Sequence, residues 1–546
     1  MRIKILILLF FVSFLGAEVK SYNEIKNEPK SLAKDYYIYR ILDETKYNKT
    51  ELKGLRGQIY RLKGKLKKKV DAIFPYKPIP KKTNCSSIGA KNILDANTTC
   101  QNALMYGGFV SKLNSQTKDA LIKKLRNFPN SVNFLEGFNY QNPAQYFADT
   151  NNAKNFIKYY KFVGEKSEKL NISFSSEFAN SLAKEDDFKN LLEYAIINKK
   201  HTNLRKSMLN ATTSSSKNGF FLGINAITFN QTQIAINFFD ITRKESTKAG
   251  DVNAANFWYY LITNDENALV TLSKSTFYDT YTLFAKEKVA NKNIDIIIPN
   301  PTKEKPQNYD ITDPFLWVKT KNKVDKFAKN GNTAELKKMA NFFDTKSTIG
   351  EYSYIMNKLN GYKDNFYPMP FMEYIGNGDN HRKALILALA RQESRFVPSA
   401  ISISYALGMM QFMPFVANDI GKKQLKIPNF DQDDMFKPEV AYKFANIHLD
   451  WLEKSLTSPV FIAYAYNGGL GFTKRMLERD DMFKNGKFEP FLSMELVPYA
   501  ESRDYAKKVL ANYIIYRQIL EPNAKISIIS ELDKLLKPAY SDKIRK

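Results

Sequence analysis

One carboxylate in this sequence follows a long apolar segment. Residues 384–390 are seven consecutive apolar residues, all good or fair helix formers, so the sequence predicts a helix that is buried on every side. Glu393 lies at its C-terminal end, and Pro398 then prevents the helix from continuing and turns the chain away. A carboxyl group held against apolar surface has its charged form desolvated, which raises its pKa and suits it to donate a proton near neutral pH. These residues therefore indicate a general acid.

A glutamate at a helix end is more often a solvated residue than a catalytic one. The residues that follow Glu393 decide between these two interpretations. A Ser-rich loop follows, and then the tight run GMMQFMP. The pattern E-S-x-x-x-P, followed by S-x-x-x-A-x-G-x-M-Q-x-M-P, resembles the catalytic motif of the Slt-type soluble lytic murein transglycosylases. These enzymes belong to glycoside hydrolase family 23 and have a goose-lysozyme-like catalytic domain. The matched residues are Glu393, Ser394, Pro398, Ser402, Ala406, Gly408, Met410, Gln411, Met413 and Pro414.

Two later blocks extend the resemblance, which covers residues 366–520. Residues 464–469, YAYNGG, are similar to the family's A-Y-N-A-G, and residues 498–505, PYAESRDY, are similar to its E-T-R-x-Y block. Three residues depart from the pattern. They are Tyr405 where the family usually has Gly, Val416 where Thr is common, and Gly468 where Ala is usual. Because Tyr405 is bulky, we expect it to narrow or reshape a subsite.

The resemblance implies roles for seven residues. Glu393 would be the catalytic acid and base. The substrate-binding residues would be Ser402 and Gln411 around the acid, Met413 and Tyr466 lining the sugar groove, Asn467 at the acetamido group, and Glu501 as a second polar group. Four of the binding residues also have a purely structural alternative: Gln411 and Asn467 as loop caps, Met413 as core filler, and Glu501 as the partner of Arg503.

The reaction implied by the resemblance uses one carboxyl group, whereas ordinary glycoside hydrolysis uses two. Glu393 would protonate the oxygen of the β-1,4 MurNAc-GlcNAc bond, and the 2-acetamido group would stabilise the positive charge on the sugar. The C6 hydroxyl would then lose its proton to Glu393 and attack C1, closing a 1,6-anhydro ring without water. The nearest later acids are Asp419 and a DQDD loop, which we expect to face solvent: Asp431, Asp433 and Asp434.

The elements around this motif read as helices. Between residues 18 and 300, segments with apolar residues at three- and four-residue spacing alternate with short polar breaks, which predicts stacked helical hairpins without a fixed repeat. Aromatic clusters at 256–262 and 276–285 are more often core than a saccharide surface at this spacing. The predicted class is mainly α. The domains would be an irregular α-superhelix at 18–300, a small helical linker domain at 301–365 and the catalytic domain at 366–546. The resemblance to the Slt-type enzymes implies that the first is ring- or U-shaped and that the last is lysozyme-like.

The N-terminus reads as an export signal. Basic residues precede a short apolar run that ends near Ala17, so residues 1–17 are expected to be a signal peptide, with retention as an anchor as the alternative. The expected location is the periplasm. Cys85 and Cys100 are the only two cysteines, and in an oxidising compartment they would most simply form a disulfide; two free thiols remain the alternative. No His lies at a ligand spacing from either, so we expect no metal and no cofactor.

The chain carries a net charge of +26, which favours an anionic partner. The export signal and the lack of any nucleic-acid motif weigh against nucleic acid, and the basic run at 61–69 is more often a solvated helix face. The expected partners are peptidoglycan glycan strands and other cell-wall enzymes. The charge also allows a peripheral contact with a membrane, and we expect a monomer.

Three functions follow from these observations. The first is a lytic transglycosylase that acts from strand ends in cell-wall remodelling and recycling. The second is a goose-type muramidase, which shares the acid but hydrolyses the bond. The third is a scaffold that binds the wall and recruits other wall enzymes.

Overall fold

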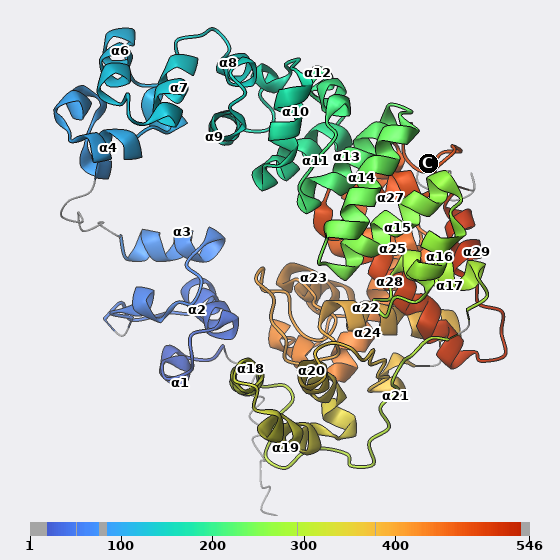
Figure 1. The fold of residues 1–546 in the computed structure, drawn as a ribbon. Coiled ribbons are helices and arrows are strands. Elements are labelled where there is room, and N and C mark those ends of the chain that lie inside the picture. Colours follow the sequence, from blue (N-terminus) through green and yellow to red (C-terminus); the bar gives the residue numbers. More distant parts are fainter. Residues whose placement is uncertain (1–18, 51, 76–84, 292, 377, 537–546) are drawn as a thin grey trace, which may run out of the picture. The chain divides into compact units, whose positions relative to one another are not determined.

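The computed structural model describes residues 19–50, 52–75, 85–291, 293–376 and 378–536 (Figure 1). The predicted signal peptide and the apolar run within it lie outside the described residues. Helices dominate the part of the chain that the structure describes, and strand-like pairing there is confined to isolated bridges. The predicted mainly α class is therefore confirmed. No helix among these residues is both long and apolar enough to cross a membrane.

The described residues form two compact units. Unit 1 takes residues from Met1–Lys77, Ile294–Ile462 and Asn512–Ile526, and unit 2 takes residues from Pro78–Asn293, Ala463–Ala511 and Ser527–Lys546. Neither unit is one continuous stretch of chain. The domain boundaries expected from the sequence stay a prediction.

Unit 2 contains the array of helical hairpins. Consecutive helices pack on one another from α6 to α10 and from α13 to α17, and α13, α14 and α15 lie side by side (Figure 1). The polar breaks supply the N-caps: the side chain of Asn114 accepts a hydrogen bond from the amide of Thr117, and Asn152 accepts one from Asn155. The helices are α4 (Thr98–Ala103), α5 (Gly107–Val110), α6 (Ser115–Lys124), α7 (Pro129–Gly137), α8 (Pro143–Asp149), α9 (Ala153–Val163), α10 (Ser176–Ala183), α11 (Lys189–Ile197), α12 (Thr202–Ser207), α13 (Ser216–Thr228), α14 (Thr232–Glu245), α15 (Ala249–Thr263), α16 (Glu266–Ser273) and α17 (Thr280–Lys288).

Most aromatic side chains of the clusters at 256–262 and 276–285 lie in the core. The ring of Phe257 stacks on Tyr281 with centroids 4.3 Å apart and meets Phe491 edge-on at 4.6 Å. Trp258 is also fully buried. These side chains therefore serve packing, as their helical spacing favoured.

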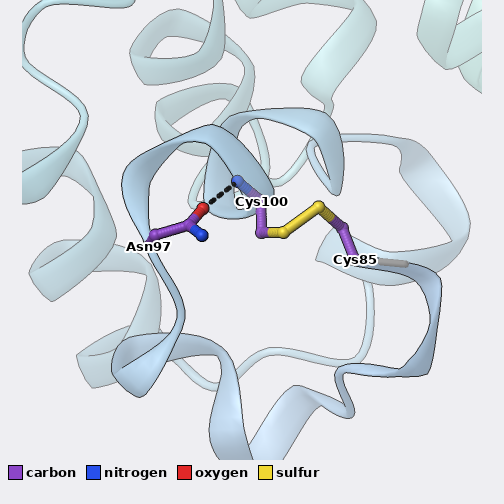
Figure 2. Close-up of a disulfide and its surroundings, with 3 residues drawn as sticks. All are labelled: Cys85, Asn97 and Cys100. Atoms are coloured by element: carbon purple, nitrogen blue, oxygen red, sulfur yellow. Dashed lines mark hydrogen bonds between the residues drawn. A yellow bond between two sulfur atoms is a disulfide. The ribbon is translucent and has the colours of Figure 1, made fainter. Parts of the chain in front are cut away.

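The disulfide between Cys85 and Cys100 is confirmed (Figure 2). The two Cα atoms lie 4.9 Å apart, and the second cysteine stands in the first turn of α4. Asn97 caps that turn by accepting a hydrogen bond of 2.8 Å from the amide of Cys100. The cross-link therefore ties the loop before α4 to a capped helix start.

In unit 1 the N-terminal helices are α1 (Tyr22–Ile25), α2 (Leu32–Glu44) and α3 (Gly64–Ile73). Helix α3 carries the basic run, with Leu66 and Val70 buried and Lys65, Lys67 and Lys68 exposed, as the solvated-face alternative predicted.

Helix α2 is buried on nearly every side, charged residues included. The ammonium of Lys34 donates to the carbonyls of Lys26 and Glu28. The carboxylate of Asp35 accepts from the amides of Tyr60 and Arg61 at 2.8 and 2.7 Å. Because each buried charge has partners, the helix can sit inside the unit without an unpaired ion.

Residues 301–365, expected to form a small helical linker domain, contain three α-helices. They are α18 (Pro314–Lys329), α19 (Thr333–Phe343) and α20 (Ile349–Leu359), packed around Val324, Leu336, Ala340, Phe343 and Ile355. The preceding segment pairs with the chain before α21, since Ile297 exchanges backbone hydrogen bonds of 2.8 Å with Asn365 and Tyr367.

Among these helices, α20 buries a carboxyl group whose two oxygens have no hydrogen-bond partner in the described structure, that of Glu351. Burial raises the pKa of Glu351 from 4.5 to about 8. Between these pH values the unfolded chain is ionised while the folded chain keeps the proton. We therefore expect the free energy of unfolding to fall as pH rises through this window, by up to ~1.4 kcal/mol per pH unit.

Denaturant unfolding of Glu351→Gln across this window tests the expectation. The amide cannot ionise, so the free energy of unfolding of the variant should lack this part of the pH dependence. At the alkaline end of the window, the stability of the variant should therefore rise relative to that of the parent. Parallel pH curves for the two proteins would contradict it.

The remaining helices are α21 (Met372–Ile375), α22 (Asn380–Glu393), α23 (Pro414–Asn418), α24 (Pro438–Glu453), α25 (Pro459–Gly468), α26 (Leu470–Leu477), α27 (Phe491–Glu495), α28 (Ala500–Leu520) and α29 (Ile528–Asp533).

Candidate active site

Helix α22 positions Glu393. Asp379 caps the helix by accepting a hydrogen bond of 2.8 Å from the amide of Arg382, and residues 384–390 have no exposed surface. The prediction of a helix buried on every side is therefore confirmed. Glu393 is its last residue and is half-buried. A rigid, fully packed helix thus ends on a carboxyl group at the edge of the core.

The chain turns immediately after this carboxyl group. Arg395 and Phe396 adopt left-handed backbone angles, with φ of 56° and 66°, so the turn occurs before Pro398 rather than at it, which corrects the sequence prediction. Helix α20 supports the turn, because a Cβ atom at Gly350 would lie 2.6 Å from the carbonyl oxygen of Phe396. The hydroxyl of Ser394 donates to the carbonyl of Met409 at 2.8 Å. This bond ties the end of α22 to the loop of residues 394–414.

Ser402 organises the first half of the 394–414 loop. Its hydroxyl oxygen accepts hydrogen bonds from the amides of Ser404 and Ala406 at 3.2 and 2.9 Å, and its own amide donates to the carbonyl of Ala406. The side chain therefore closes a tight turn, and its hydroxyl proton is the part that can be offered to a ligand.

Gln411 organises the second half of the loop. Its side-chain nitrogen donates to the carbonyls of Ala400 and Gly408 at 3.1 and 2.7 Å, which is the capping role that the structural alternative gave it. The amide oxygen remains as its acceptor. Met413 is half-buried at the N-cap of α23, so its thioether is not core filler alone.

Gly408 is required at the centre of this loop. Its φ is 75°, and an added Cβ atom would lie 2.0 Å from the carbonyl oxygen of Met435. We expect Gly408→Ala to lower the free energy of unfolding by about 3 kcal/mol, since it adds backbone strain and a clash with main chain. Gly361→Ala is the matched control. Its φ is 62° with no described atom within 4 Å, so it should cost only about 1 kcal/mol. Equal losses in urea unfolding would remove the clash argument.

The DQDD loop does not face solvent, contrary to the sequence expectation. Asp431 and Asp433 form ion pairs with Arg40 at 2.6 and 2.9 Å, and Arg40 is 1% exposed. The phenols of Tyr36 and Tyr37 donate to Asp433 at 2.5 and 2.9 Å. Burial raises the pKa of Asp433, and the positive charge of Arg40 offsets part of this increase. The sequence expectation failed because these partners lie almost four hundred residues away.

In unit 2, α25 carries Tyr466 and Asn467, both half-buried. The side-chain oxygen of Asn467 accepts a hydrogen bond of 2.6 Å from the hydroxyl of Ser502, which is buried. Sequence reasoning did not assign Ser502, although it lies inside the quoted PYAESRDY block. Gly468 is explained by packing, because a Cβ atom there would lie 2.6 Å from the ring of Phe472.

Glu501 lies in the first turn of α28 and is exposed. The guanidinium of Arg503 donates instead to Glu193 at 2.7 Å and to the carbonyl of Val497 at 2.8 Å. The alternative that made Glu501 the partner of Arg503 is therefore not what the structure shows.

A further residue that the sequence analysis missed is Arg391, two positions before Glu393. It donates to the carbonyl of Phe366 at 3.0 Å and to the side chain of Asn512 at 2.7 Å, and its guanidinium lies 3.9 Å from the ring centre of Tyr367. It thus ties the last turn of α22 to its surroundings. No group of three or more His, Cys, Asp or Glu residues in the described ranges could hold a metal ion.

Comparison with known proteins matches residues 371–488 to the family "Transglycosylase SLT domain". A Haemophilus influenzae protein that is named a soluble lytic murein transglycosylase is 29% identical to this chain over 222 residues. The aligned residues cover 40% of this chain and 34% of the relative. The soluble lytic murein transglycosylase of Salmonella typhimurium is 26% identical over 171 residues, which cover 30% of this chain and 26% of the relative. The chain thus spans about a third or less of the length of these curated relatives.

Among solved structures, the 70 kDa soluble lytic transglycosylase of Escherichia coli aligns with a TM-score of 0.46 at 15% identity, covering 93% of this chain and 94% of that one. The family match includes the end of α22, the 394–414 loop and α25. Residues 371–488 of this chain are therefore a transglycosylase SLT domain, with Glu393 inside it.

Proposed function

We propose that this protein is a peptidoglycan lytic transglycosylase that cleaves the β-1,4 MurNAc-GlcNAc bond and leaves 1,6-anhydro-MurNAc ends. The observation that carries the proposal is the half-buried carboxyl group of Glu393 at the end of a fully buried helix, inside a transglycosylase SLT domain. The relatives named above are murein transglycosylases, which supports murein as the substrate.

A mechanism with a single carboxyl group is supported by the state of the other acids near the loop. In unit 1, Asp431 and Asp433 are committed to Arg40 and to two tyrosine hydroxyls. A hydrolase needs a second carboxylate that is available to activate water or attack the sugar. We propose that Glu393 carries out both proton transfers, as the resemblance to the Slt-type enzymes implies.

The steps balance without water. Glu393 gives its proton to the glycosidic oxygen as the C1–O bond breaks, and the 2-acetamido group of MurNAc stabilises the charge at C1. The carboxylate of Glu393 then accepts the proton of the C6 hydroxyl while the O6–C1 bond forms. The enzyme is returned to its protonated state, and the product has lost no atoms to solvent.

The remaining residues would hold the sugar. The hydroxyl proton of Ser402 and the amide oxygen of Gln411 are the polar atoms that these side chains can still offer to a ligand. We propose that Met413 and Tyr466 line the groove. Asn467 would contact the acetamido group, and Glu501 would orient the substrate.

We further propose that the protein works in the periplasm, from strand ends, during wall remodelling and recycling. Other wall enzymes are the expected protein partners.

The test is mass spectrometry of the muropeptides that the purified protein releases from sacculi. Anhydro-MurNAc ends, one water lighter than the hydrolytic product, would support the proposal. Reducing MurNAc ends would instead indicate a goose-type muramidase. Binding to sacculi without release would indicate a wall-binding scaffold.

A further inference from the structure

One residue of the 394–414 loop holds a backbone conformation that its side chain does not favour. Tyr405 has φ of 66°, in the left-handed region. For a bulky residue this costs about 1 kcal/mol or more relative to glycine. Such a conformation persists only where neighbouring groups hold it.

The neighbouring groups belong to helix α2, more than 350 residues earlier in the chain. The ring of Tyr405 lies 6.0 Å from the ring of Tyr36 and 5.8 Å from that of Tyr39, centroid to centroid. Arg61, whose amide is held by Asp35 of α2, also reaches the loop, donating to the carbonyl of Ile403 at 3.4 Å. Aromatic contacts of this kind contribute about 0.5–1.5 kcal/mol beyond their buried area, enough to offset the backbone cost.

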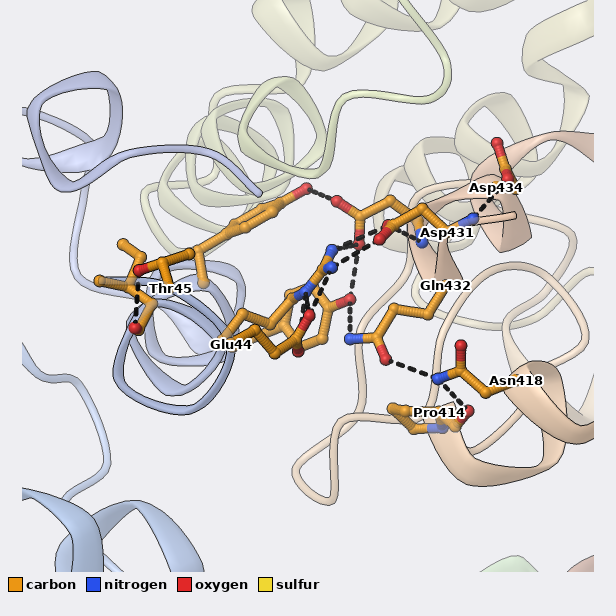
Figure 3. A network of polar contacts seen from close by, with 12 residues as sticks. Glu44, Thr45, Pro414, Asn418, Asp431, Gln432 and Asp434 are labelled. Atoms are coloured by element: carbon orange, nitrogen blue, oxygen red, sulfur yellow. Dashed lines mark hydrogen bonds and ion pairs between the residues drawn. The ribbon is translucent and has the colours of Figure 1, made fainter. Parts of the chain in front are cut away.

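Helix α2 also reaches the far end of the loop through hydrogen bonds (Figure 3). The hydroxyl of Tyr36 accepts from the side-chain nitrogen of Gln432 at 2.8 Å, and Gln432 accepts from Asn418 at 3.2 Å. Asn418 in turn donates to the carbonyl of Pro414 at 2.9 Å. The same helix thus contacts the loop at Tyr405 and, through two side chains, at the residue after Met413.

Helix α2 is a firm base for both contacts. Arg40 joins it to Asp431 with two hydrogen bonds of 2.9 and 2.6 Å. Its remaining buried charges are satisfied by main-chain groups, as described above. The loop therefore has one end on α22, through Ser394, and its middle and far end on α2.

We infer that Tyr405 is a positioning residue that uses helix α2 to fix the 394–414 loop relative to Glu393. The inference rests on the proposed function, because the loop is the part of the site that would hold the sugar. It also gives a reason for Tyr405 where the resemblance leads one to expect Gly. Glycine would adopt the left-handed conformation freely, whereas tyrosine is held in it by the contact of its ring with helix α2.

The test compares Tyr405→Phe, Tyr405→Gly, Tyr39→Leu and the double variant Tyr405→Gly/Tyr39→Leu, with kcat and KM measured separately on soluble glycan strands. Tyr405→Phe keeps the ring and should stay within about twofold of the parent. Tyr405→Gly relieves the backbone strain but releases the loop, so we expect about a tenfold loss of kcat/KM without a lower melting temperature. The double variant should lose no more than Tyr405→Gly alone, because both changes break the same contact.

Lys426→Gly is the matched control, since Lys426 is exposed with φ of 49° and glycine relieves the same kind of strain there. It should leave kcat/KM unchanged. Parent-like kinetics in Tyr405→Gly, or losses that multiply in the double variant, would overturn the inference.

A readout without activity separates this inference from the proposed function. Hydrogen exchange at the amides of Leu407 and Phe412, which bond to each other's carbonyls across the loop, should become faster in Tyr405→Gly and Tyr39→Leu. Exchange in residues 384–390 should not change. If the parent releases no anhydro ends, the proposed function fails while this result still decides whether α2 holds the loop. Unchanged exchange at both amides would overturn the inference by itself.

Discussion

Replacing Glu393 by glutamine is expected to reduce the release of anhydro-muropeptides from sacculi by about 1,000-fold or more while leaving the fold intact. A positioned general acid contributes about 10²–10⁴-fold, and here the same group would also act as the base. The amide matches the carboxyl in size but cannot act as a general acid, because its N–H protons are not acidic near neutral pH. Because the side chain is half-buried at a helix end, the change should cost little stability. Mass spectrometry of the products and thermal unfolding measure the two effects.

Glu373→Gln is the matched control, since it makes the same chemical change at an exposed position in α21. It should retain the activity of the parent. Parent-like product release by Glu393→Gln would show that Glu393 is not the acid. An equal loss in both variants would point to an effect on folding or charge rather than on proton transfer.

Replacing Arg40 by alanine is expected to give the largest loss of stability, about 3 kcal/mol or more from unit 1. The guanidinium is 1% exposed and pairs with Asp431 and Asp433, so its removal leaves two carboxylates partly buried without their cation. The chain has three tryptophans, and only Trp258 lies in unit 2. Fluorescence-detected urea unfolding in a Trp258→Phe background would therefore report on unit 1, through Trp317 and Trp451.

Lys321→Ala provides the comparison. Lys321 forms an i,i+4 pair with Asp325 on the surface of α18, with 46% of its side chain exposed. Such a pair contributes less than about 0.5 kcal/mol. If Arg40→Ala shifted the urea midpoint no more than Lys321→Ala, the buried ion pairs of Arg40 would contribute no more to stability than a surface pair. This outcome would contradict the prediction.

Where the sequence analysis succeeded, the deciding information was local. Residues 384–390 form an uninterrupted apolar run of good or fair helix formers, which favours a helix packed on all sides, and every one of them is buried. The polar breaks before residue 300 contain Asn, Ser or Asp residues that cap helices that follow. The two cysteines had only each other as partners within the chain.

Where it failed, the deciding partner was remote. Asp431 and Asp433 look like a solvated turn, because charge in a sequence usually indicates exposure. Their cation, Arg40, stands 391 residues before Asp431 on a helix whose own charges also suggest a surface. The sequence analysis did not single out Glu351, which looks like an ordinary polar helix residue; its carboxyl group is buried, and neither oxygen has a hydrogen-bond partner in the described structure.

By itself, the sequence determined the helical class and the position of Glu393 at the end of a buried helix, and it favoured the pairing of Cys85 with Cys100 over two free thiols. These follow from residue type and spacing over a few turns of chain. Only the tertiary structure decided that helix α2 is packed against the DQDD loop and against Tyr405, and that Arg503 pairs with Glu193 rather than with Glu501. The physical reason is that an ion pair or a ring contact depends on distance in space, and residue spacing along the chain carries no record of it.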